Sequence, residues 1–208
     1  MTSKFIVFEA IDGAGKTTQI KLLRDALEAR GIGCYITAEP TDMPSGKKIR
    51  EALSGRVPVT TAQMADMFAT DRVIHNRDRE QGIDVMLEGG KTVISDRYYY
   101  SSLAYQGAEI GYEHVAALNL DNPDIRMPDM CIFLDLSPEK SLERIGKRAD
   151  TPTEIYENYD YLEKTRRMFF DIFERLKQRG EHIEIIDASG TAEEIANTIL
   201  EKVLPIFI

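Results

Sequence analysis

The strongest chemical signal in the sequence lies near the N-terminus, in the run Ala10-Ile11-Asp12-Gly13-Ala14-Gly15-Lys16-Thr17-Thr18. This run fits the P-loop pattern, except that Ala10 stands where the pattern has its first glycine. The two glycines allow successive backbone N–H groups to face one anion, and a helix that begins here adds its partial positive charge. Lys16 is then placed to reach the β- and γ-phosphates of a nucleoside triphosphate, and the Thr17 hydroxyl to bind Mg²⁺. The alternative interpretation is a glycine-rich turn with an exposed lysine. Ala10 is compatible with the loop if its φ is negative and costly if its φ is positive.

A second group of charged residues ends the apolar run at 92–95, where Asp96 and Arg97 follow Ser95. An aspartate at the tip of a strand beside the P-loop strand can hold the water ligands of Mg²⁺, and the neighbouring arginine can bridge phosphates. The alternative is a salt-bridged strand end. Asp135 is a rival acid at a strand end, but it lacks an adjacent arginine and leads into a capped helix. We therefore favour Asp96 as the metal-binding acid.

The elements that must position these residues are readable from hydrophobic periodicity. Short apolar runs predict strands at residues 4–8, 33–37, 92–95, 130–135 and 182–186. Between them lie amphipathic helical patterns, two of which open with capping boxes, Thr60 with Gln63 and Thr191 with Glu194. Strands that alternate with helices predict an α/β fold of three layers, with a five-stranded parallel sheet and helices on both faces.

The composition limits the class of protein. With 43% apolar and 29% charged residues, the chain is neither disordered nor disulfide-stapled, and its apolar runs are far shorter than the roughly 20 residues of a membrane span. A net charge of −9 argues against nucleic acid as a partner. The two cysteines lie in apolar stretches without metal-ligand spacing, which favours a reducing compartment, the cytoplasm. Since the 208 residues contain no linker or internal repeat, we expect a single domain, residues 1–208.

Taken together, these motifs resemble those of thymidylate kinases, which are P-loop nucleoside-monophosphate kinases. Residues 8–19 resemble the phosphate loop of that family, and Glu39-Pro40 with Arg50 downstream resembles its second motif. Residues 96–107, which begin Asp96-Arg97-Tyr98, resemble the third motif, and this one is highly diagnostic. The resemblance implies a P-loop kinase fold with a short lid at about residues 146–157. It also implies ATP-dependent phosphorylation of dTMP to dTDP, with Mg²⁺, in a homodimer.

The resemblance further implies roles for individual side chains. Asp12 would lie near the acceptor sugar, Phe68 would stack on the thymine, and Arg72 would contact a base oxygen. Lys16 and Arg97 would act on the phosphates, with lid cations drawn from Arg144, Lys147 and Arg148. The acceptor site as a whole would contain Glu39, Pro40, Arg50, Phe68, Arg72, Arg97, Tyr98, Ser101, Tyr105 and Gln106. Among the consecutive rings at residues 98–100, we expect one in the core, one exposed and one at the pocket.

Two alternatives stay open at this point. Ala38 and the pair Thr41-Asp42 depart from the family pattern near the acceptor, which leaves open a kinase for another nucleoside monophosphate. The second alternative is a non-catalytic nucleotide-binding module. The complete set of Lys16, Thr17, Asp96 and Arg97 argues against it, because a module that only binds has no need of a phosphate clamp.

Overall fold

The computed structural model describes residues 2–146 and 159–208 and contains one five-stranded sheet in the order β2-β3-β1-β4-β5, with all neighbouring strands parallel. The strands are β1 (Phe5–Ala10), β2 (Cys34–Ala38), β3 (Thr92–Asp96), β4 (Met130–Asp135) and β5 (Ile183–Asp187). Each strand predicted from the sequence is present, with its ends moved by at most two residues.

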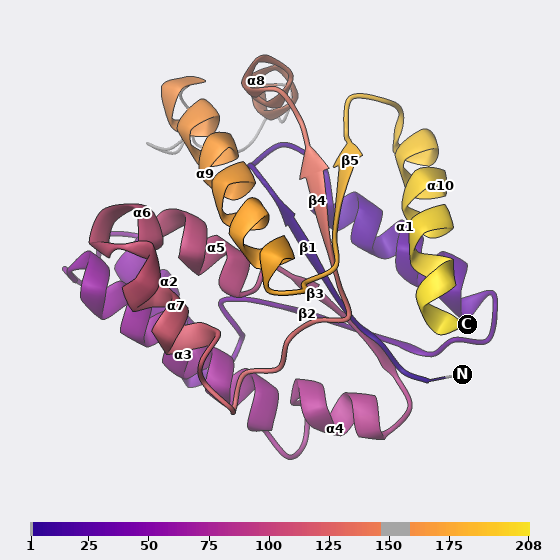
Figure 1. The fold of residues 1–208 in the computed structure, drawn as a ribbon, viewed down its shortest axis with the longest axis horizontal. Helices are drawn as coiled ribbons and strands as arrows, with labels where there is room; N and C mark the ends of the chain where they lie inside the picture. The colour runs from indigo at the N-terminus through magenta and orange to yellow at the C-terminus, as the bar shows by residue number, and fades with distance from the viewer. Residues whose placement is uncertain (1, 147–158) are drawn as a thin grey trace.

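Helices cover both faces of the sheet (Figure 1). On one face lie α1 (Lys16–Glu28) and α10 (Ala192–Val203), and on the other α3 (Thr61–Arg77), α5 (Tyr99–Tyr105) and α9 (Tyr159–Gln178). The remaining helices are α2 (Pro44–Leu53), α4 (Ile83–Glu88), α6 (Gly107–Ile110), α7 (Tyr112–Asn119), α8 (Pro138–Gly146) and the 3₁₀ helix η1 (Leu204–Phe207). Both capping boxes are present, since Thr60 and Thr191 each accept from the third residue of the helix that follows.

The burial of strand β1 on both of its faces shows why the fold has three layers. All six of its residues are buried, and successive side chains enter opposite cores. Ile6 and Phe8 pack with α1 and α10, whereas Phe5 and Val7 pack with α5 and α9. A strand covered on both faces is typical of a parallel sheet between two helical layers. The predicted three-layer α/β fold is confirmed.

The order of the strands also determines where a site can form. The central strand β1 has β3 on one side and β4 on the other, with Phe8 opposite Asp96 and Ala10 opposite Leu134. The loops that leave these neighbouring strands therefore diverge from one point at the carboxyl edge of the sheet. Open α/β sheets bind ligands in such a crevice. Within the described ranges, no helix has the length and apolar character to cross a bilayer.

The expectation that the tyrosines at 98–100 divide between core, surface and pocket is wrong, because all three rings are buried. Their hydroxyl groups have partners inside the protein. Tyr99 and Tyr100 both donate to Oε2 of Glu181, at 2.8 and 2.6 Å, and Tyr98 donates to the Arg126 carbonyl at 3.0 Å. A buried tyrosine is tolerated when its hydroxyl is hydrogen-bonded, so polarity alone is a poor guide to its place.

The buried Glu181 gives a prediction about stability. Burial raises its pKa, and the hydrogen bonds from Tyr100 and Tyr99 oppose this shift in part. A carboxyl whose folded pKa is raised stabilises the fold most below its unfolded pKa, about 4.3, and this contribution is lost as pH rises through the folded value. We expect Glu181→Gln, whose amide oxygen still accepts from the tyrosines, to gain stability relative to the wild type between pH 5 and pH 8.

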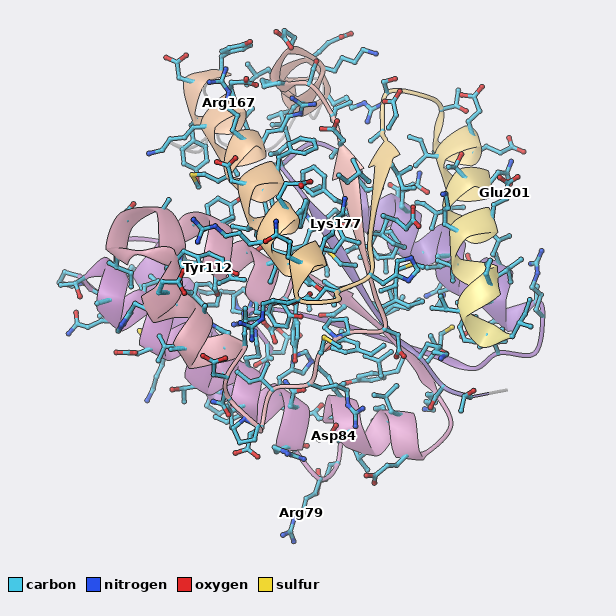
Figure 2. The ribbon with its side chains drawn as sticks, viewed as in Figure 1. Arg79, Asp84, Tyr112, Arg167, Lys177 and Glu201 are labelled. Carbon is cyan, nitrogen blue, oxygen red and sulfur yellow. The ribbon has the colours of Figure 1, made fainter. Side chains whose placement is uncertain are left out.

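Urea unfolding of both proteins at the two pH values measures this difference. Glu201→Gln is the matched control, since Glu201 lies on the exposed face of α10 (Figure 2). The control is expected to show no change of the difference with pH. A constant or decreasing difference for Glu181→Gln would contradict the prediction.

Candidate active site

The P-loop has the backbone that its glycines predict. Gly13 and Gly15 adopt positive φ values of 80° and 93°, and Gly15 immediately precedes α1. Ala10 is the last residue of β1, and among the described non-glycine residues only Arg97 has a positive φ. The alanine at the first glycine position of the pattern is therefore accommodated without backbone strain.

The P-loop packs directly on α8. The Ser141 hydroxyl donates to the Asp12 carbonyl, and a Cβ on Gly13 would lie 2.9 Å from the Ser141 carbonyl oxygen. A side chain at position 13 would thus meet both an unfavourable φ and the backbone of α8. Helix α8 leads into residues 147–158, so the predicted lid cations Lys147 and Arg148 lie outside the described residues. Arg144 lies within them, and its Nη2 donates to the Ala188 carbonyl after β5 at 2.9 Å.

Arg97 is the centre of the charged cluster at this edge. Its φ of 72° turns the side chain back toward the P-loop, where Nη2 donates to Asp12 Oδ1 at 2.8 Å and Nη1 to Ser101 Oγ at 3.1 Å. Tyr105 also belongs to this group, since the Arg97 guanidinium carbon lies 5.9 Å from the centre of its ring. The structure therefore brings together four residues that the sequence assigned to the site.

Glu9 is a member of this cluster that sequence reasoning missed. It lies on β1 with no exposed surface, and its carboxylate accepts from the backbone N–H groups of Tyr98 and Ser101 and from the Ser101 hydroxyl, at 2.9, 3.2 and 2.7 Å. Burial raises the pKa of Glu9, while the charge of Arg97 opposes the shift. The sequence did contain a sign of this role: Glu9 is the one acid in an otherwise apolar strand, and a buried acid requires hydrogen-bond or ionic partners.

Lys16 lies beside the predicted metal-binding acid. Its Nζ is 3.8 Å from Asp96 Oδ1, and burial together with the charge of Arg97 lowers the pKa of the lysine. An anion bound between Lys16 and Arg97 would relieve the repulsion between these two cations. Thr17 and Asp96 line one cavity of about 590 Å³ beside strand β2.

The rival acid Asp135 is already engaged. Arg166 on α9 donates from Nε and Nη2 to its two carboxylate oxygens, at 2.5 and 2.8 Å. In the described part of the chain, no group of three or more His, Cys, Asp or Glu residues could hold a metal ion. The Thr17 hydroxyl and the Asp96 carboxylate, which line the same cavity, are oxygen donors, and oxygen is the ligand type that Mg²⁺ takes together with phosphate and water.

The residues expected at the acceptor side form a buried network next to this cluster. A cis peptide joins Glu39 to Pro40, and Arg72 donates to Glu39 Oε2 from Nε at 2.8 Å. Arg72 has only 1% of its surface exposed, so its contact surface for a base is small. Phe68 is half-buried and belongs to neither apolar core of the described chain.

The loop between β2 and α2 is fixed from both sides. Arg50 donates to the Pro40 carbonyl at 2.8 Å and to Asp42 at 3.0 Å. Asp71 on α3, which sequence reasoning missed, accepts from the Thr41 backbone and hydroxyl at 2.8 and 2.7 Å. Thr41 is one of the departures from the family pattern, and its hydroxyl thus has a defined structural partner. Gln106, at the end of α5, is half-buried, and within the described ranges its side chain makes no hydrogen bond to the protein.

A glycine loop before α1, a lysine and an arginine facing it, and an acid on the neighbouring strand define a P-loop phosphotransferase. Comparison with known proteins identifies the family: the thymidylate kinase profile matches residues 8–199. A probable thymidylate kinase of Methanococcus aeolicus is 39% identical over 205 residues, covering 97% of this chain and 96% of its own. The thymidylate kinase of Leptospira borgpetersenii is 36% identical over 198 residues, covering 95% and 91%. The chain belongs to the thymidylate kinase family and is an enzyme.

Proposed function

We propose that this enzyme transfers the γ-phosphoryl group of ATP to dTMP, giving ADP and dTDP. The observation that carries the proposal is the convergence of Lys16, Arg97, Asp12 and Asp96 at the carboxyl edge of β1 and β3. This cluster can hold two phosphorylated ligands with their charged ends together. Family membership identifies the acceptor as dTMP.

The donor side is built on the P-loop. The backbone N–H groups of residues 10–18 surround the ATP phosphates, and Lys16 contacts the β- and γ-phosphates. Thr17 and Asp96 would hold Mg²⁺, directly or through water, and the bound ion would supply positive charge to the phosphates of ATP. Arg144 and Arg148 supply further positive charge from the lid side. The hydrogen bond from Arg144 to the Ala188 carbonyl holds this side chain near the loop that follows β5.

The acceptor side uses residues from α2, α3 and α5. Arg97, with Ser101, orients the acceptor phosphate against the γ-phosphoryl group, and Arg50 is a further phosphate ligand. The acceptor phosphate is already ionised at neutral pH, so no general base is required and catalysis rests on positioning and electrostatics. The nucleoside lies between Phe68, which stacks on the base, and Tyr105. The remaining acceptor-site residues are Glu39, Pro40, Arg72 and Gln106. Tyr98, which the sequence also assigned to this site, is fully buried and packs against Arg72 instead.

An acceptor panel tests this function. Purified enzyme with Mg-ATP is assayed for ADP release with dTMP, dUMP, dCMP, dAMP, dGMP and thymidine in parallel. We expect kcat/KM for dTMP to exceed that for every other acceptor by at least about tenfold, the discrimination that a few pocket contacts provide. Preference for another monophosphate would contradict the assignment of the base site. Binding of ATP without turnover of any acceptor would favour a nucleotide-binding module.

The homodimer is part of the same proposal. Leu53 at the end of α2 and Ile74 on α3 are 48% and 39% exposed, and we propose that they lie in the contact between the two copies. Light scattering after size exclusion is expected to give a dimer for the wild type and a shift toward monomer for Ile74→Glu. Met127→Glu is the matched control, because Met127 is also exposed, at 58%, but lies before β4. A monomeric wild type would contradict this prediction.

We assign all 208 residues to one kinase domain, since a single sheet contains every described strand. Cys34 and Cys131 are both free thiols, which fits the cytoplasm as the compartment. The net charge of −9 argues against nucleic acid as a partner, so the phosphates of nucleotides must be met locally, by Lys16, Arg97 and backbone N–H groups.

A further inference from the structure

His75 is a buried histidine to which the sequence gave no role. It lies on α3 with 2% of its side chain exposed, and both of its ring nitrogens have partners. Nε2 is 2.7 Å from Thr37 Oγ1 on strand β2, and Nδ1 is 3.0 Å from Glu39 Oε1. Because a carboxylate only accepts hydrogen bonds, Nδ1 donates in the contact with Glu39.

Glu39 transmits this contact to Arg72. Its Oε1 is held by His75, and its Oε2 accepts from Arg72 Nε and Nη2, at 2.8 and 2.7 Å. The two oxygens therefore have different partners, and rotation of the carboxylate would break both contacts at once. Loss of the histidine would leave only one of its oxygens fixed.

Arg72 is nearly saturated by its surroundings. Besides Glu39, it donates from Nη1 to Asn119 Oδ1 and from Nη2 to Ser102 Oγ, and its guanidinium carbon lies 5.2 Å from the centre of the Tyr98 ring. A guanidinium has five N–H donors, so within the described chain one N–H on Nη1 has no protein acceptor. With 1% of Arg72 exposed, that N–H can be reached only by a group that packs closely against the residue.

The spacing along α3 connects these residues to the nucleoside. Phe68, Arg72 and His75 are four and three residues apart, so they lie along one face of the helix. Of the three, His75 lies furthest along the helix from Phe68, and its Nε2 contacts Thr37 on strand β2. One helix face therefore carries a stacking ring, a hydrogen-bond donor and the group that orients this donor.

We propose that His75 is a positioning residue for recognition of the acceptor base: anchored by Thr37, it holds Glu39 so that Arg72 presents its remaining N–H to the base in one orientation. The inference rests on the proposed function, in which Arg72 contacts the acceptor base. His75 itself touches neither substrate. Its effect is on acceptor affinity and base selectivity, and the ATP site is unaffected because Lys16 and the P-loop lie outside this chain of contacts.

The test compares His75→Ala with His75→Asn, since the asparagine amide can still donate an N–H toward Glu39 Oε1. For His75→Ala we expect KM for dTMP to rise about tenfold or more, as for loss of a buried hydrogen bond to a charged group. KM for ATP is expected to stay within about twofold. Selectivity for dTMP over dCMP is expected to fall, and His75→Asn to recover most of both losses.

A second measurement uses the 590 Å³ cavity, which His75 and Thr37 line and through which a small molecule can reach the vacated site. Added imidazole is expected to lower KM for dTMP in His75→Ala and to leave the wild type unchanged. Tyr100→Phe is the control for general destabilisation. It removes a buried hydrogen bond from Tyr100 to Glu181, and Tyr100 packs in the apolar core beside α9. Its melting temperature is expected to fall without a change in either KM.

These outcomes separate the inference from the proposed function. Wild-type turnover of dTMP tests the function, whereas the ratio of variant to wild-type KM tests the role of His75. If KM for dTMP stays within twofold in His75→Ala, or if KM for ATP and dTMP rise equally, the positioning role is overturned. A failure of His75→Asn to recover any of the loss would also overturn it.

Discussion

Replacement of Arg97 by alanine is expected to lower kcat for dTMP phosphorylation about 10³- to 10⁵-fold, the range for an arginine that stabilises a transferring phosphoryl group. The transition state spreads negative charge over the γ-oxygens, and Arg97 is the side chain that the structure holds between the P-loop acid Asp12 and the acceptor-side Ser101. Its partners fix the guanidinium before substrate binds, so little reorganisation is needed during the reaction. Single-turnover kinetics at saturating Mg-ATP and dTMP measure the chemical step.

Two further variants test whether the loss in Arg97→Ala is specific to this guanidinium. Arg97→Lys keeps the charge but loses the planar fork, and we expect it to recover only a small part of the rate. Arg79→Ala removes an exposed arginine at the opposite edge of the molecule (Figure 2) and is expected to have wild-type kinetics. A loss of less than tenfold in Arg97→Ala would remove Arg97 from its assigned role.

The second large effect is expected at Lys16. Lys16→Met keeps the length and apolar stem of the side chain but removes the charge, and we expect kcat/KM for ATP to fall on the order of 10²- to 10³-fold, as for loss of one preorganised donor. Burial and the charge of Arg97 lower the pKa of Lys16, and a bound phosphate would oppose this shift by favouring the charged lysine. Steady-state kinetics and calorimetric titration with ATP separate the effects on binding and rate.

The control for Lys16 is an exposed lysine outside the cavity. Lys177→Met removes an exposed lysine of α9 (Figure 2) and is expected to change kcat/KM by less than about twofold. ATP affinity and turnover in Lys16→Met that match those of this control would contradict the assignment of Lys16 to the phosphates.

Patterns among neighbouring residues were enough to predict the P-loop and the fold class of this protein. The glycines that need positive φ, the strand ahead of them and the helix after them are neighbours in the chain, so the P-loop is readable without a fold. Apolar side chains recur toward the core every second residue in a strand and about every 3.6 residues in a helix. These two patterns can be recognised within a few neighbouring residues. For the same reason the three-layer parallel fold followed from alternating strands and helices.

The contacts that complete the site join residues far apart in the chain, and only the tertiary structure decided them. Glu9 and Ser101 are 92 residues apart, and Asp135 and Arg166 are 31 apart, so no short pattern links the partners. Sequence analysis favoured Asp96 over Asp135 on local grounds, whereas the ion pair of Asp135 with Arg166 is visible only in the tertiary structure. The burial of all three tyrosines likewise depended on whether a distant acid could accept their hydroxyl groups.

The sequence alone thus determined the fold class, the phosphate loop and the family resemblance, because these depend on backbone conformation and periodicity encoded by adjacent residues. The tertiary structure decided which side chains are free to meet a ligand and which are held by partners, as with Arg72 on Glu39 and His75 behind it. The physical reason is that a buried charge is stable only with specific partners, and strand order and helix packing determine which residues those are.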